Sequence, residues 1–380
     1  HKAEAESIRD ETIATLHADA ATAQANAIAG HAAAIEAESD RHQQQVAENL
    51  RARNAQWTAL EKRWFDGLKA NISSLEAIRD DLSSRFMEFT DPAWKAWQSP
   101  TIAPPAITLG QLRFDRTAVD GGVPTDPRLI TDQPARFELP AMIALPTRSS
   151  LQIDVDPESR DTGMDLLRAT MLRILTTIPP GKARFTIMDP VGLGQNFAGF
   201  MHLEDEMPGL VGERIWTEPR QIEQKLTDIT EHMETVIQKY LRNEFASIDA
   251  YNVAAGEIAE PYRFLVIADF PSNFTEEAAR RLASILQSGP RCGVFTLLLR
   301  DRRGEMPEKF DVADLDRSMV TVRSTSDGMI FDAEEMADLV FTPAPGPPDD
   351  LLIEMARRVG HAALEAGKVE VPFETIAPKP

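Results

Sequence analysis

The spacing of apolar residues sets a helical N-terminal stretch apart from the rest of the chain. From Val46 to Phe89 apolar residues recur every three or four positions, which is the spacing of one helix face. Residues 1–98 are rich in alanine, glutamate, glutamine and arginine, and they contain no proline before Pro92. The pattern predicts a helical stalk or coiled coil that offers its stripe to partner helices. A helical hairpin with a break near Gly30 or Asn54 is the alternative.

Residues 99–148 have a different pattern, because prolines recur throughout them. Proline interrupts helices and is tolerated only in edge strands. Short apolar segments at 107–114 and 141–145 are typical of such strands. We therefore expect a small proline-rich β collar, or linker, between the stalk and the following domain.

Residues 149–303 alternate between apolar runs and amphipathic stretches. We expect strands at 150–155, 183–188, 263–268 and 293–299, and helices at 164–177, 218–245 and 276–287. Such alternation is typical of an α/β domain in which helices flank a mostly parallel sheet. Ligands of these sheets bind at the carboxyl ends of the strands, so the 156–165 loop, Asp189 and Asp269 are expected at one edge.

Residues 304–380 predict a bridging segment that leads towards a further downstream domain. Two short strands, at 319–322 and 329–331, precede a proline-rich loop at 343–348. A helix at 350–366 and an extended exit at 369–373 follow. The chain begins with His1 rather than methionine, so we expect it to be part of a longer protein.

Composition narrows the classes of partner and compartment. The net charge of −20 argues against broad contact between this segment and DNA phosphates. A single cysteine, Cys292, excludes an internal disulfide and favours a reducing, cytoplasmic location. No apolar run is long enough for a membrane helix, so we expect no membrane segment here.

Several stretches in order along residues 149–303 resemble one family of motor ATPases. Arg184-Phe-Thr-Ile-Met-Asp-Pro190 resembles its second core strand, and Phe200-Met-His-Leu203 stands where the family has a short turn. Phe264-Leu-Val-Ile-Ala-Asp-Phe270 resembles a Walker B strand, and 293–303 resembles the strand after it. The series is similar to the FtsK/SpoIIIE branch of the FtsK–HerA ATPases, which have RecA-like cores. The resemblance implies a homo-oligomeric ring, with ATP and Mg²⁺ in the parent protein and DNA as its possible substrate.

The departures from that family concern the residues that would bind and hydrolyse nucleotide. A P-loop reads GxxxxGK followed by Ser or Thr, but residues 149–180 contain no lysine and only one glycine, Gly163. Four acidic residues in this segment would repel a triphosphate, namely Asp154, Asp156, Glu158 and Asp161. Phe270 stands where a Walker B strand carries its second acid, and a phenyl ring cannot polarise water. We therefore expect no catalytic residue, no metal site and no bound cofactor in this chain.

The remnant of a nucleotide site would consist of Gly163, Asp269 and Asp189. The structural alternatives are that the Asp269 carboxylate accepts hydrogen bonds from loop amides and that Asp189 is a turn residue. Arg300, Arg302 and Arg303 could reach a neighbouring subunit, or could belong to a solvated charged loop.

These features predict a non-catalytic, pseudo-ATPase module of a multi-domain translocase. Its role would be structural, oligomeric or regulatory, beside an active ATPase downstream, in the translocation of DNA. An active or nucleotide-regulated ATPase with an unorthodox site is the first alternative. A protein-secretion motor or an interaction scaffold is the second.

Overall fold

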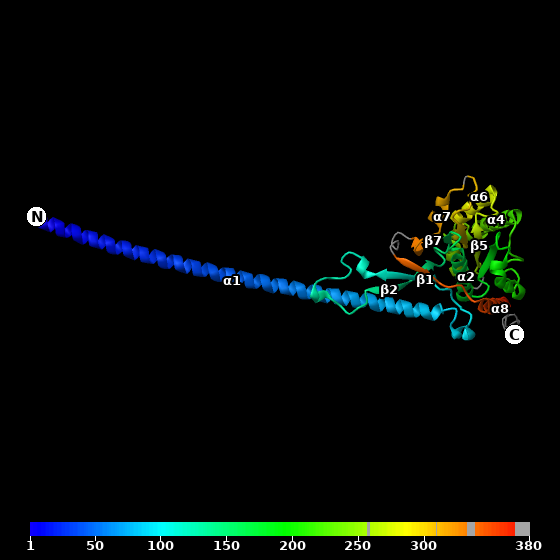
Figure 1. The fold of residues 1–380 in the computed structure, drawn as a ribbon, viewed down its shortest axis with the longest axis horizontal. Coiled ribbons are helices and arrows are strands. Elements are labelled where there is room, and N and C mark those ends of the chain that lie inside the picture. The colour runs from blue at the N-terminus through cyan, green and yellow to red at the C-terminus, as the bar shows by residue number, and fades with distance from the viewer. Residues whose placement is uncertain (257–258, 309, 333–338, 369–380) are drawn as a thin grey trace, which may run out of the picture. The chain divides into compact units, whose positions relative to one another are not determined.

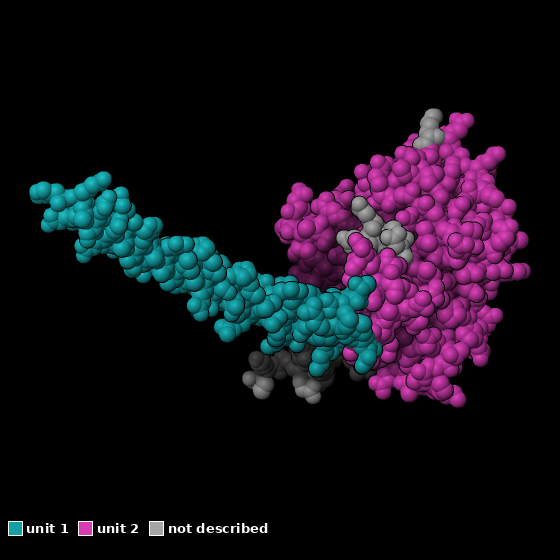
Figure 2. Space-filling view, turned by 60° about the vertical axis from the view of Figure 1, so that its left-hand side comes forward, with its two compact units in different colours: residues 1–74, 124–132 teal, residues 75–123, 133–380 magenta. Residues whose placement is uncertain are grey.

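The computed structural model describes residues 1–256, 259–308, 310–332 and 339–368, and the extended exit predicted at 369–373 lies outside them. In this part of the chain one long helix precedes a sheet with its covering helices (Figure 1). The chain divides into two compact units (Figure 2). The smaller unit is His1–Ser74 with Pro124–Asp132, and the larger is Leu75–Val123 with Gln133–Pro380.

Helix α1 is a single helix from Lys2 to Arg85, so the alternative of a hairpin with a break near Gly30 or Asn54 is wrong. Alanine and long unbranched side chains keep the glycines from interrupting it. Within the smaller unit, the Arg128 guanidinium lies 3.6 Å from the centre of a Trp57 ring. The Trp64 indole donates a hydrogen bond of 3.1 Å to the Leu129 carbonyl. Association of α1 into a coiled coil stays a prediction.

The described strands of the larger unit form one sheet in the order β2-β1-β9-β8-β7-β3-β6-β5-β4. The part from β7 to β4 is parallel, which confirms the α/β class, whereas the pairs from β2 to β7 are antiparallel. The sheet is therefore mixed as a whole, and its parallel part also includes β7, which lies outside the region predicted to form the parallel sheet. Its strands are β1 (Ala106–Asp115), β2 (Arg136–Ala144), β3 (Leu151–Val155), β4 (Ala183–Met188), β5 (Tyr262–Phe270), β6 (Val294–Asp301), β7 (Val320–Thr325), β8 (Gly328–Asp332) and β9 (Val340–Pro343).

Helices cover both faces of the parallel strands, as the continuous apolar runs of those strands require. Leu151 and Leu297 belong to a core with α2 and α8, whereas Leu265 and Leu298 belong to a core with α4 and α6. The helices after α1 are α2 (Arg160–Thr177), α3 (His202–Glu206), α4 (Pro219–Thr235), α5 (Ile248–Ala255), α6 (Glu276–Ser288), α7 (Val312–Ser318) and α8 (Asp349–Ala366).

The structure differs from the predicted elements at several places. The helix expected over 218–245 is α4 followed by a π-helical segment, Val236–Leu241, and it ends at Arg242, whose φ of 44° is left-handed. Helices α3, α5 and α7 and strand β9 were not predicted, because each is too short to show a clear period. Strands β1, β2 and β7–β9 extend the central sheet on one side.

Residues just after α1 pack into the core of the larger unit. Phe86, Phe89 and Trp94 are buried in the same cluster as α2. The Trp97 indole donates a hydrogen bond of 3.1 Å to the Thr176 carbonyl at the end of α2. The last part of the predicted stalk stripe therefore contributes apolar side chains to the α/β core.

Candidate functional site

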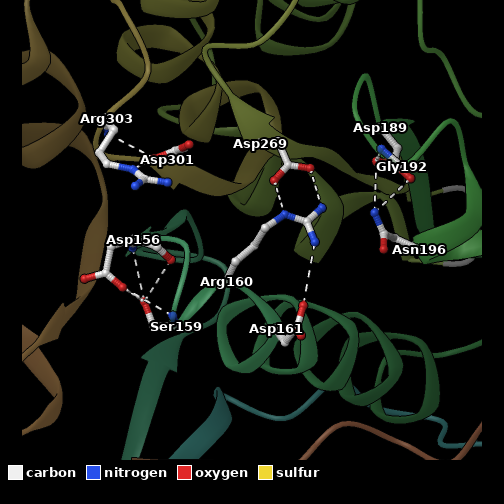
Figure 3. A network of polar contacts seen from close by, with 10 residues as sticks. All are labelled: Asp156, Ser159, Arg160, Asp161, Asp189, Gly192, Asn196, Asp269, Asp301 and Arg303. Carbon is white, nitrogen blue, oxygen red and sulfur yellow. Dashed lines mark hydrogen bonds and ion pairs between the residues drawn. The ribbon is translucent and has the colours of Figure 1, made fainter.

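The carboxyl ends of the parallel strands bring the predicted site residues to one edge of the sheet (Figure 3). Asp156 follows β3, Asp189 follows β4, and Asp269 lies near the end of β5. This is the edge at which open α/β sheets bind their ligands. Its chemistry depends on what each carboxylate contacts.

The Asp269 carboxylate is held by Arg160, the first residue of α2 (Figure 3). Nε and Nη2 of Arg160 each donate a hydrogen bond of 2.7 Å, one to each carboxylate oxygen. Asp269 is 4% exposed, and its φ of 53° is a left-handed conformation that aspartate tolerates better than most residues. The Asp269 hydrogen bonds raise the pKa of Arg160. The acid predicted to be a Mg²⁺ remnant is thus occupied by a guanidinium of its own chain.

The connection between β3 and α2 runs only from Asp156 to Ser159. The Asp156 carboxylate closes it by accepting hydrogen bonds from the Ser159 hydroxyl at 2.7 Å and the Ser159 N–H at 3.2 Å. These contacts lower the pKa of Asp156. Helix α2 begins four positions earlier than the predicted start at residue 164, so the loop expected over 156–165 is largely helical. The connection is shorter than the GxxxxGK pattern that surrounds a phosphate group.

Gly163 lies inside α2 and faces the sheet. A Cβ atom at this position would lie 2.6 Å from Cγ1 of Val155 and 2.8 Å from Cδ1 of Leu299. The glycine therefore allows α2 to approach β3 and β6 closely, which is a packing requirement. A role in phosphate binding stays a prediction that this geometry does not need.

Asp189 organises the turn after β4. Its carboxylate accepts hydrogen bonds from the Gly192 N–H at 3.0 Å and from the Asn196 amide at 3.1 Å (Figure 3). It also accepts one from the Gly194 N–H at 3.0 Å. The side chain is fully buried. These contacts agree with the alternative in which Asp189 is a turn residue.

Asp154 does not belong to an acidic loop, and the prediction that it would repel a triphosphate there is wrong. It lies within β3, fully buried, and accepts a hydrogen bond of 2.8 Å from Nη2 of Arg300. Burial raises the pKa of Asp154 and outweighs the opposing effect of Arg300. The strand predicted at 150–155 already includes Asp154, but the sequence did not show that Arg300, 146 positions away, is its partner.

The three arginines predicted to reach a neighbouring subunit have different surroundings. Arg300 is committed to Asp154, and its side chain is 12% exposed. Arg302 donates a hydrogen bond of 2.9 Å to the Ser324 carbonyl. The Arg303 side chain is 65% exposed and lies 3.9 Å from Asp301. Arg302 and Arg303 are both exposed, and a contact of either with another subunit stays a prediction.

Phe270 places its ring in the core rather than in the site. The ring is fully buried, with its centre 4.9 Å from that of Phe274 and 5.5 Å from that of Phe310. The side chain at the second Walker B position therefore packs in the α4–α6 core and supplies no group for activating water.

No group of three or more His, Cys, Asp or Glu side chains is arranged to hold a metal ion in the described ranges. Helices in those same ranges are all too short or too polar to cross a bilayer.

Arg160 is the residue of this edge that sequence reasoning missed. It is the first basic residue after β3, but the P-loop pattern requires a lysine and therefore gives an arginine at this position no role. A cation at the start of a helix opposes the helix dipole and needs an anion nearby. That mismatch was the signal in the sequence that could have indicated a partner such as Asp269.

Comparisons with known proteins give only distant similarity. No protein-family model matches the sequence, and no curated protein matches it. The structure is similar to ATPases 2 and 3 of EssC from Geobacillus thermodenitrificans, with 14% identity and a TM-score of 0.47, over 74% of this chain and 52% of that one. ATPases 2 and 3 of Thermomonospora curvata EccC, in complex with a signal sequence peptide, are similar with 14% identity and a TM-score of 0.46. That match covers 69% of this chain and 47% of the EccC chain.

The pCW3 conjugation coupling protein TcpA, as a monomer with ATPγS, gives 13% identity and a TM-score of 0.46, over 75% of each chain. The chain spans about half the length of the EssC and EccC structures. These structures are of the kind that the sequence resemblance led us to expect. Because their TM-scores lie below 0.5, the function has to be argued from the residues of this chain.

Proposed function

We propose that this chain is a non-catalytic RecA-like module of a multi-domain translocase, with a structural or regulatory role beside an active ATPase. The observation that supports this most directly is the bidentate ion pair between Arg160 and Asp269. Phosphoryl transfer depends on charge positioned around the phosphates and the metal. An aspartate neutralised by its own chain cannot hold Mg²⁺ unless that pair first separates.

The remaining parts of a hydrolytic site are also missing. No lysine lies in the short turn before α2, and Phe270 supplies no base. The turn is already closed by the hydrogen bond that the Ser159 hydroxyl donates to the Asp156 carboxylate. Binding, water activation and charge stabilisation would therefore each need a group that this edge does not provide.

The parent protein would use ATP and Mg²⁺ in another module and assemble into a ring. With a charge of −20 this segment is unsuited to line a DNA channel, so we assign any contact with DNA to other parts of the protein. Whether the cargo is DNA, as proposed, or polypeptide is decided by those parts. A cytoplasmic location remains part of the same proposal.

One observation favours the alternative of a nucleotide-regulated module. Ser159 makes no side-chain cap on α2, so its hydroxyl does not occupy the first N–H groups of that helix, which are groups of the kind that bind anions. A phosphate bound there would have to lie beside Arg160. Nucleotide would then act as a structural ligand without being hydrolysed.

Calorimetric titration of the chain with ATP and Mg²⁺ tests the proposal. We expect no binding at nucleotide concentrations up to the millimolar range and no release of phosphate. Micromolar binding without turnover would favour the nucleotide-regulated alternative. Turnover that Asp269→Asn abolishes would overturn the proposal.

A further inference from the structure

A cavity of about 260 Å³ lies within the larger unit, away from the edge described above. The end of α1, strands β1, β2 and β9, and helix α2 all contribute to its lining. Apolar surface comes from side chains such as Phe86, Leu139 and Pro345. The cavity is therefore suited to a small ligand with an apolar body.

Arg173 of α2 lines this cavity with a buried guanidinium that has no partner. The residue is 5% exposed, and its Nε is buried without any hydrogen bond among the described residues. The centre of the guanidinium lies 4.8 Å from the ring centre of Phe89 and 5.7 Å from that of Phe86. Glu88 attracts it through space without forming a hydrogen bond. Two aromatic rings thus fix the position of a cation that the chain does not neutralise.

A buried unpaired cation is costly, and proteins usually pair such groups. Burial lowers the pKa of Arg173 to about 10, so the side chain is still protonated at pH 7. A guanidinium binds a planar carboxylate with two parallel hydrogen bonds. Arg173 therefore offers a carboxylate the donors of a guanidinium on a residue that is itself 5% exposed.

The charges around the cavity favour a ligand with a single negative charge. The lining carries two arginines, Arg79 and Arg173, and two acids, Glu88 and Glu138, so it has no net charge, although neither acid forms an ion pair with Arg173 in the described part of the chain. A triphosphate or another polyanion would meet two carboxylates for two guanidiniums. A monocarboxylate needs only one unpaired guanidinium, which Arg173 supplies.

We propose that this cavity binds a monocarboxylate with an apolar body, and that Arg173 is its charge partner. The site is independent of the proposed loss of nucleotide hydrolysis, because it shares no residue with the Arg160–Asp269 edge. The carboxylate could belong to a free acid or to the C-terminal residue of a peptide. Both sources present the same chemistry to Arg173.

The probe is N-acetyl-L-leucine, titrated into the whole chain by calorimetry, with N-acetyl-L-leucinamide as a neutral analogue of the same shape. We expect the acid to bind at least tenfold more tightly than the amide. A peptide ending in leucine, compared with its amidated form, distinguishes the two sources. Equal binding of acid and amide, or no binding of either acid or peptide, would overturn the proposal.

Arg173→Met tests the residue itself. It should reduce acid binding at least tenfold while the melting temperature stays the same or rises, because an uncompensated buried charge is removed. Arg79→Met is the matched control, since Arg79 lines the same cavity but is exposed, and it should change binding less than threefold. A purely structural Arg173 predicts the opposite result, with a lower melting temperature and unchanged preference for the acid.

Discussion

Replacing Arg160 with methionine leaves the Asp269 carboxylate buried without its counter-ion. The Asp269 side chain is 6% exposed and that of Arg160 is 31% exposed, so the two partners differ in how well water can replace the lost contact. Asp269→Asn instead leaves an arginine that can turn partly into solvent. Asparagine also tolerates the left-handed conformation of this position. The first substitution should therefore cost more stability than the second.

The magnitudes follow from the burial of each partner. Removing one partner of a fully buried ion pair costs about 3–5 kcal/mol, whereas exposed pairs contribute about 0–1 kcal/mol. Because Arg160 is one-third exposed, we expect about 2–3 kcal/mol for Arg160→Met and about 1 kcal/mol for Asp269→Asn. The double variant should resemble Asp269→Asn, since no buried charge is then left unpaired. The coupling free energy would be about 2–3 kcal/mol.

Urea unfolding of the chain, the two single variants and the double variant measures these free energies as a cycle. Arg168→Met is the control, because Arg168 lies on the same helix and pairs with the exposed carboxylate of Asp349. It should cost less than about 1 kcal/mol. Additive effects of the two substitutions, or a larger loss for Asp269→Asn than for Arg160→Met, would refute the assignment of Asp269 as a buried carboxylate neutralised by Arg160.

Three further predictions concern packing, pH and the N-terminal helix. Gly163→Ala should destabilise the chain by about 1–3 kcal/mol in urea unfolding, because its Cβ would lie 2.6 Å from Val155; unchanged stability would mean that α2 can move away. Burial lowers the pKa of His232 from 6.5 to about 4, so the unfolded chain takes up a proton first as the pH falls. The contribution of His232 to the free energy of unfolding is complete above pH 6.5, and it declines by about 2–3 kcal/mol as the pH falls towards 4. His232→Gln should remove this part of the pH dependence. An identical pH profile for the variant would contradict this. Deletion of residues 1–45, which are exposed, should leave the melting temperature unchanged. Deletion of residues 1–98 also removes buried aromatic side chains of the core, so it should lower the melting temperature sharply. Equal melting temperatures of the two truncated chains would show that those aromatic residues do not stabilise the core.

Periodicity predicted the parts of the fold whose burial is uniform along an element. Four of the parallel strands, β3 to β6, were predicted because helices cover both of their faces, which leaves apolar runs in the sequence. Periodicity did not distinguish the end of the stalk, which packs in the core, from the rest of the helix. Phe86 and Phe89 continue the helical spacing of α1, although they are buried with the sheet. A spacing pattern shows which side of a helix is apolar, but it does not show what covers that side.

The candidate site shows the same division between pattern and pairing. The rule for parallel sheets placed Asp156, Asp189 and Asp269 at one edge, and the structure has them there. The ionic partners could not be predicted, because Arg160 and Asp269 are 109 positions apart in the sequence. Residue type alone gave Asp154 and Asp156 the same role. One is buried with Arg300, and the other closes a turn.

Arg160 and Arg173 of α2 differ in whether the chain supplies an anionic partner, and this difference determines whether each arginine can bind a ligand. Arg160 is neutralised by Asp269, so an anion that approached it would have to compete with a carboxylate already in place. Arg173 lies on the same helix between aromatic rings, with no acceptor bound to it in the described part of the chain. Replacing the first should therefore cost stability without revealing a ligand, whereas replacing the second should spare stability and abolish binding. A loss of stability for Arg160→Met without such a loss for Arg173→Met would distinguish a closed site from an open one on a single helix.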